Sequence, residues 1–156
     1  MEPQFIATIK NQLESIQEIV RFYNKHFPES QHSESYKLSN YINNSIKPII
    51  ITIRVETKII GLFESWLKDD NSGTRKLVTL LVDPKFRGHK FGDRLFFNAN
   101  EIAHKEQSGS YWILHFRDSN RAFLEPYYSR FGFKEICLSG NYTNGEQKWE
   151  MRRRVG

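Results

Sequence analysis

One short run of the sequence has the residue types of an anion-binding turn: Arg87-Gly88-His89-Lys90-Phe91-Gly92. It follows an apolar run at residues 77–82 and precedes a helical pattern. The start of a helix leaves backbone N–H groups without partners and carries a partial positive charge. The two glycines let the backbone approach a ligand closely, and three side chains of the run add positive or polar groups. The order strand, basic turn, helix therefore predicts a site for a phosphate or pyrophosphate.

Taken alone, this turn also fits a basic surface loop. It lacks the terminal Gly-Lys-Ser/Thr of a nucleotide-binding P-loop and the three-glycine spacing of a dinucleotide-binding fold. His26, His32, His89 and His104 show no metal-ligand spacing, so no metal site is predicted. The single cysteine, Cys137, is expected to be a buried thiol in a strand, although a catalytic thiol stays open.

A second run, Pro126-Tyr127-Tyr128-Ser129-Arg130-Phe131-Gly132-Phe133, lies downstream, beyond a predicted helix and a predicted strand. With both runs, the chain resembles the GNAT superfamily of acetyl-CoA-dependent N-acetyltransferases. Residues 82–92 are similar to the family's V-x-P-x-(Y/F)-R-G-x-G-x-G loop, and residues 126–133 to its P-F-Y-x-x-x-G-F element. The resemblance implies one N-acetyltransferase domain over residues 1–156. Its expected reaction is acetyl transfer from acetyl-CoA to a primary amine, by direct attack in a ternary complex.

The resemblance also implies where acetyl-CoA binds. Backbone groups of the strand before the turn would bond to the pantetheine amides, and N–H groups of the turn would hold the pyrophosphate. Lys90 stands where the family most often has glycine, and its N–H serves there if the residue is helical. Asn120 is a weaker match, because it lies one residue further from Tyr128 than the family's asparagine does. The expected cofactor-binding residues are Leu80, Leu81, Val82, Arg87, Gly88, His89, Lys90, Phe91, Gly92 and Asn120.

Two side chains are expected to move protons. By the resemblance, Tyr128 is the general acid that protonates the departing thiolate; the alternative is a ring packed in the core. Tyr127 is expected to project to a different side and to be structural. Many relatives have, on the strand before the turn, a glutamate that acts as the general base, where this chain has Lys76. Glu64 on the preceding strand is therefore the expected base, with His115 second; a solvent-facing Glu64 remains the alternative.

The acceptor amine is less defined. In the superfamily it is held by segments that correspond to residues 28–33 and 139–145, and neither carries the acidic cluster expected for a polycation. A small amine, an amino acid or a protein amine all remain open. A homodimer also remains open. A coenzyme A-binding protein without turnover remains open as well, because of Lys76 and Lys90. The net charge of +5 would also suit nucleic acid, but no aromatic RNA-binding signature supports it. Without a signal peptide or a membrane-spanning stretch in the sequence, a cytoplasmic location is expected.

These side chains need a scaffold of strands and helices. The strand, turn, helix and strand at residues 77–116 form a βαβ unit, so its two strands should be parallel, whereas the earlier strands should be antiparallel. The expected fold is α/β: a mixed, mostly antiparallel sheet with a parallel pair and helices on both faces. The resemblance implies that the parallel pair is splayed. Strands are predicted at residues 5–9, 49–55, 58–67, 76–82, 111–116, 133–138 and 147–153. Helices are predicted at residues 11–27, 33–43 and 91–107, with a short one from Phe123 or Leu124 to Gly132.

Overall fold

A computed structural model describes residues 2–8, 13–27, 47–68 and 73–156 of the chain. The predicted second helix at residues 33–43 and the predicted acceptor segment at residues 28–33 lie outside these ranges. The strands are β1 (Gln4–Thr8), β2 (Ile49–Val55), β3 (Lys58–Leu67), β4 (Thr74–Val82), β5 (Tyr111–Arg117), β6 (Glu135–Asn141) and β7 (Gln147–Arg154). The helices are α1 (Leu13–His26), α3 (Phe91–Lys105) and α4 (Arg121–Ser129), with short 3-10 helices η3 (Pro84–Phe86) and η4 (Asp118–Asn120).

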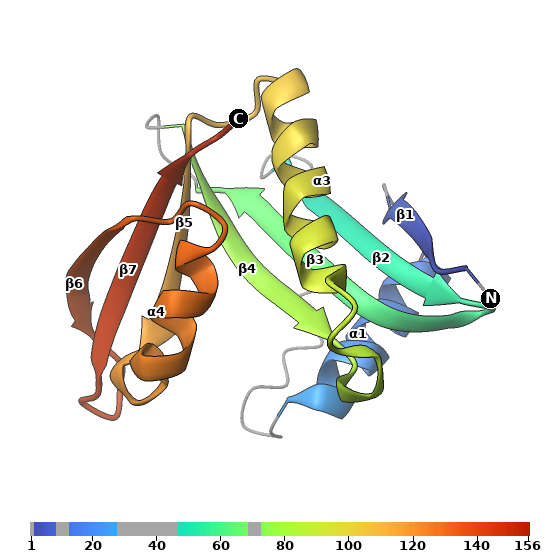
Figure 1. The fold of residues 1–156 in the computed structure, drawn as a ribbon, viewed down its shortest axis with the longest axis horizontal. Helices are drawn as coiled ribbons and strands as arrows, with labels where there is room; N and C mark the ends of the chain where they lie inside the picture. Colours follow the sequence, from blue (N-terminus) through green and yellow to red (C-terminus); the bar gives the residue numbers. More distant parts are fainter. Residues whose placement is uncertain (1, 9–12, 28–46, 69–72) are drawn as a thin grey trace.

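All seven strands form one sheet in the order β1-β2-β3-β4-β5-β7-β6. Every neighbouring pair is antiparallel except β4 and β5. This parallel pair is registered only at its first residues: Thr74 with Tyr111, Arg75 with Trp112 and Lys76 with Ile113. Beyond these rungs the two strands diverge, and the sheet opens into a V (Figure 1). The expected mixed sheet with a splayed parallel pair is confirmed.

Helices cover both faces of the sheet, as the sequence predicts (Figure 1). The crossover helix α3 packs on one face through a stripe of fully buried residues, Leu95, Phe96, Ala99 and Ala103. This spacing is that of an amphipathic helix. The short helix α4 lies on the same face over β5 and β7, whereas α1 packs on the opposite face against β2, β3 and β4. None of the described helices is long and apolar enough to cross a bilayer.

A buried arginine holds the closed end of the V. Arg75 is fully buried on β4, and its guanidinium donates to the Ser108 carbonyl (2.9 Å), the Lys47 carbonyl (2.8 Å) and the hydroxyls of Ser65 and Ser108 (2.9 Å each). Burial lowers its pKa to about 10, so the group stays charged at neutral pH. These bonds tie β3 and β4 to the connection that leads from α3 into β5.

Three expectations about the C-terminal part are wrong. Cys137 is exposed, because β6 is an edge strand whose residues are nearly all exposed. The same strand runs to Asn141, into the segment expected to be a loop. The short helix also begins earlier than expected, at Arg121, with Pro126 inside it.

Candidate active site

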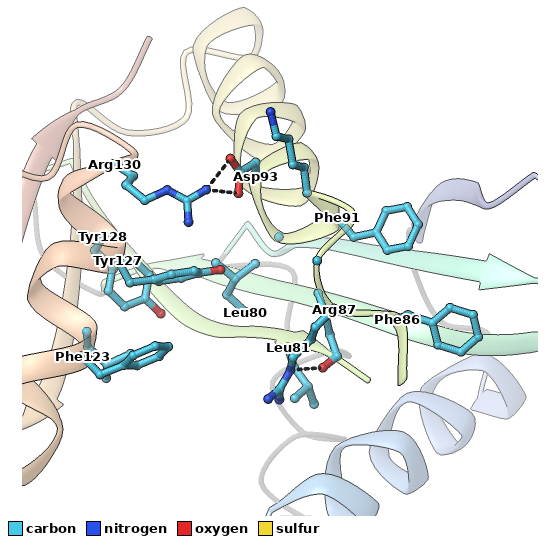
Figure 2. A pocket seen from close by; sticks show the side chains of 15 residues that line it. Leu80, Leu81, Phe86, Arg87, Phe91, Asp93, Phe123, Tyr127, Tyr128 and Arg130 are labelled. Carbon is cyan, nitrogen blue, oxygen red and sulfur yellow. Dashed lines mark hydrogen bonds and ion pairs between the residues drawn. The ribbon is translucent and has the colours of Figure 1, made fainter. Parts of the chain in front are cut away.

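A cavity of about 370 Å³ lies at the open end of the parallel pair. Its walls come from the end of β4, the turn into α3 and the inner face of α4 (Figure 2). Most of the predicted cofactor-binding residues line it, whereas His89, Asn120 and Glu64 do not. The predicted residues in its wall are Leu80, Leu81, Val82, Arg87, Gly88, Lys90, Phe91, Gly92 and Tyr128.

The end of β4 offers backbone groups to a ligand. Its pairing with β5 stops at Lys76, so the β5-facing edge of residues 77–82 has no ladder partner in the described sheet. The register against β3 shifts between Glu64 and Ser65, which leaves Val78 as an extra residue in β4. Such a bulge bends and twists a strand, here where β4 leaves its parallel neighbour. An extended molecule with amide groups could complete this edge, as an added strand does.

The turn after β4 is shaped for an anion. Gly88 has a φ of +88°, and a Cβ there would meet nothing within 4 Å. Lys90 caps α3 in the left-handed conformation, with φ 61° and ψ 24°. It therefore does not adopt the helical conformation that the sequence analysis required, and the family's glycine at this position has a conformational reason. The first helical bond runs from Arg94 N–H to the Lys90 carbonyl, so residues 91–93 supply the N–H groups of a helix start.

Lys90→Gly is expected to keep or raise the melting temperature. A left-handed residue other than glycine bears a strain of about 1–2 kcal/mol, which glycine relieves at some cost in chain entropy. Lys85→Gly in η3 is the control, because no such strain is relieved there. Equal losses of melting temperature in the two variants, measured by differential scanning calorimetry, would contradict the argument.

Two adjacent tyrosines of α4 reach the cavity. Their rings are 5.2 Å apart and inclined by 78°. Tyr128 packs edge-on against Phe131 and Phe133, and burial, with Tyr127 second, raises the pKa of its hydroxyl. This phenol is therefore protonated over the whole neutral range.

Tyr127 was expected to serve structure alone, yet it lines the same cavity. A Cβ placed on Gly92 would lie 2.7 Å from its hydroxyl oxygen, so its ring spans the cavity from α4 to the first turn of α3. The ring of Phe123 stacks on it at 6.0 Å. Only the glycine at position 92 could have signalled this approach in the sequence.

An ion pair that the sequence analysis missed joins the two sides of the cavity. Arg130 Nη2 lies 2.8 and 3.0 Å from the two carboxylate oxygens of Asp93 (Figure 2). Asp93 stands in the first turn of α3, and Arg130 caps the end of α4. The pair therefore links the helix start that would bind an anion to the helix that carries the tyrosines.

The sequence matches a known protein-family model over most of its length. The family model described as acetyltransferase (GNAT) domain matches residues 9–155. The chain belongs to the GNAT family of acetyltransferases. A comparison with curated proteins found no match.

Solved structures share the GNAT fold over nearly the whole chain. A GNAT-family protein from Desulfovibrio desulfuricans superposes with a TM-score of 0.79 at 14% identity, covering 99% of this chain and 100% of that one. The aminoglycoside 6'-N-acetyltransferase of Enterococcus faecium has a TM-score of 0.78 at 13% identity, with 98% and 97% covered. The PaiA N-acetyltransferase of Thermoplasma acidophilum, solved with coenzyme A, has a TM-score of 0.67 at 13% identity, with 98% and 100% covered. At these identities the likeness supports the fold alone.

The second predicted catalytic residue of this GNAT domain lies on the α1 face. Glu64 is fully buried, between its cross-strand partners Ile50 and Thr79. Its charge contributes, after burial, to the raised pKa of Tyr23 on α1. Glu64 is therefore not the solvent-facing strand residue that the alternative described.

The other candidate base, His115, lies on the same face. Its Nε2 is 2.9 Å from Glu150 Oε1, and Arg152 donates to the other oxygen of that carboxylate at 2.7 Å. Burial lowers the pKa of His115; the hydrogen bond to Glu150 opposes this, and the charges of Lys76 and Lys148 add to the lowering. Among the described residues, no group of three metal-ligating side chains comes together.

The lowered pKa of His115 predicts a pH dependence of stability. A group whose folded pKa is depressed stabilises the fold above its unfolded value, near 6.5, and that stability is lost as the pH falls. Between pH 7.5 and 5.0 the melting temperature of the parent should therefore fall more than that of His115→Gln. His89→Gln, at an exposed position, is the control and should follow the parent. Parallel curves for all three proteins would show that His115 is not the group responsible.

Proposed function

We propose that the protein is an N-acetyltransferase that passes the acetyl group of acetyl-CoA directly to a primary amine in a ternary complex. The observation that carries this proposal is the parallel pair β4–β5, joined at one end and open at the other over a cavity. The open edge of β4 suits the amides of a pantetheine arm, and the helix start suits a pyrophosphate. The family match supports the same reaction.

Different parts of the cavity wall would bind different parts of acetyl-CoA. Leu80, Leu81 and Val82 would pair with the pantetheine amides through their backbone, and Arg87, Gly88 and residues 90–92 would receive the pyrophosphate. Arg87 is exposed at the cavity, and its Nε donates to the Val82 carbonyl at 3.1 Å. This bond leaves the rest of its guanidinium for a phosphate. His89 and Asn120 stand outside the cavity wall and are left out of the proposed site.

The proposed reaction needs three proton transfers. Glu64 first removes a proton from the incoming ammonium, directly or through water. The lone pair of the free amine then attacks the thioester carbonyl carbon, the carbon–sulfur bond breaks, and the sulfur takes a proton from Tyr128. The second proton that the nitrogen loses on becoming an amide returns the Tyr128 phenolate to the phenol. A positioned acid or base of this kind contributes about 10²–10⁴-fold.

Two measurements on the pure protein test the proposal. Acetyl-CoA at a hundredfold excess over Kd should stabilise the fold by about 2.7 kcal/mol, read as a higher melting temperature. Thiol release from acetyl-CoA with a panel of amines should then reveal turnover. No thermal shift at millimolar acetyl-CoA would contradict cofactor binding. A shift without thiol release would instead favour a coenzyme A-binding protein without activity.

Arg87→Ala should weaken acetyl-CoA binding by about tenfold and change kcat little, because a phosphate contact is made in both the ground and the transition state. Isothermal titration gives the Kd and steady-state kinetics give the kcat. Lys85→Ala on neighbouring η3, outside the cavity wall, controls for the loss of one positive charge. Equal Kd values for the two variants would remove Arg87 from the phosphate site.

A further inference from the structure

The α1 face carries basic side chains where the parallel strands part. Lys76 stands on the last paired rung of β4, opposite Ile113. His115 follows Ile113 on the same face of β5, and its cross-strand partner is Glu150 on β7. Lys148 and Arg152 lie on that face of β7, two residues to either side of Glu150. We call this set the α1-face cluster: Lys76, His115, Lys148, Glu150 and Arg152.

Two lysines of the α1-face cluster lack an acidic partner. The carboxylate of Glu150 is taken by Arg152 and His115. Among the described residues, none forms an ion pair with Lys76 or Lys148, and Lys148 lies over the Tyr142 ring at 5.0 Å. Both lysines are half-buried. Burial, followed by the charge of Lys148, lowers the pKa of Lys76. The Glu150 carboxylate opposes this lowering, but it already binds Arg152 and His115. Two half-buried like charges without an anion of their own cost stability, which a bound anion would relieve.

The cluster also lies on a face from which an acceptor can approach. The proposed acetyl-CoA cavity is on the α3 and α4 face, between the ends of β4 and α4. An amine that attacks a thioester held between the diverging strands can approach from the other face. On that face Glu64 is a carboxylate for the ammonium. Lys76 lies on the last paired rung at the closed end of the V, whereas Lys148 lies toward the open end, opposite Arg117 at the end of β5.

We propose that the acceptor is a small amine that also carries a carboxylate or a phosphate, and that Lys76 and Lys148 bind this anionic group. The inference rests on the proposed function and names the substrate class for the same site. A lysine and a phosphate or carboxylate form a charge-assisted bond, whereas a polyamine would be repelled by both lysines. Lys76, which replaces the glutamate of many relatives, thereby has a role in choosing the acceptor.

A panel of matched amines tests the substrate class. Glycine, 4-aminobutyrate and phosphoethanolamine are compared with glycinamide, 4-aminobutanamide and ethanolamine, and with 1,4-diaminobutane, by thiol release from acetyl-CoA. At least one anionic amine should exceed its neutral partner in kcat/KM by about tenfold or more, after correction for the fraction of free amine. The carboxylate and phosphate pairs separate the two sources of charge. Turnover confined to neutral or dicationic amines would overturn the inference and leave the transferase proposal standing.

Two variants tie the selectivity to the lysines. Lys76→Met and Lys148→Met should each raise KM for the anionic amine by about tenfold and leave kcat/KM for its neutral partner within about twofold. Lys58→Met, at the exposed first residue of β3, removes the same charge and should match the parent. An unchanged KM in both cluster variants would overturn the inference.

If no amine of the panel is acetylated, binding measurements still test the anion site. Saturation-transfer NMR on the coenzyme A-bound protein would then use 4-aminobutyrate and phosphoethanolamine as probes. Binding that is lost in Lys76→Met supports the anion site, although the transferase proposal has failed. No binding of either probe overturns the inference.

Discussion

Tyr128→Phe is expected to lower kcat by about 10²-fold or more while the Kd of acetyl-CoA changes by less than about twofold. The substitution removes only the hydroxyl and keeps the ring that packs against Phe131 and Phe133. Burial raises the pKa of this phenol, so it holds its proton at neutral pH; in the proposed reaction the sulfur of the leaving group takes that proton. Steady-state kinetics with an accepted amine, together with calorimetric titration of acetyl-CoA, give the two quantities.

The neighbouring tyrosine provides a matched control for this experiment. Tyr127→Phe removes a hydroxyl from the same cavity, but that hydroxyl lies at Gly92, beside the helix start. It should therefore leave kcat within about threefold of the parent. A Tyr128→Phe enzyme that turns over at the parent rate would mean that water or the substrate supplies the proton.

Arg75→Ala is expected to lower the free energy of unfolding by about 3–5 kcal/mol. The carbonyls of Lys47 and Ser108 lose their donor at about 1–3 kcal/mol each, and the removed side chain leaves a cavity. Urea unfolding followed by circular dichroism measures the change.

An exposed charged pair supplies the comparison. Lys105→Ala breaks the pair with Glu101, one helical turn away on the surface of α3, and should cost only about 0.5 kcal/mol. If Arg75→Ala is no more harmful than this control, the buried guanidinium does not clamp the closed end of the V.

Much of the fold could be predicted because local signals agreed with it. The bounds of β2 and β3 match the prediction, since a β-branched run and a two-residue turn at Glu56 and Thr57 define them locally. The parallel pair followed from the strand–helix–strand order. The exposure of Cys137 could not be predicted, because it depends on β6 being the outer strand of the sheet, and sequence alone does not give that position.

Some of the site residues could likewise be predicted from the sequence, and others could not. The turn at residues 87–92 lies in one stretch of chain, so its types and spacing were readable. The backbone of Lys90 was not, because a lysine gives no sign of a positive φ. The approach of Tyr127 to Gly92 and the pair Asp93–Arg130 join segments that are distant in sequence, and only the packing of α4 beside α3 brings them together.

The open edge of β4 has a consequence for kinetics. Its backbone groups and the helix start would hold the pantetheine and the pyrophosphate, which acetyl-CoA and the spent coenzyme share. Contacts of this kind do not distinguish acetyl-CoA from free coenzyme A, so the two should bind with similar affinity. Coenzyme A is thus expected to act as a competitive product inhibitor against acetyl-CoA, and its release, rather than acyl transfer, is expected to limit turnover.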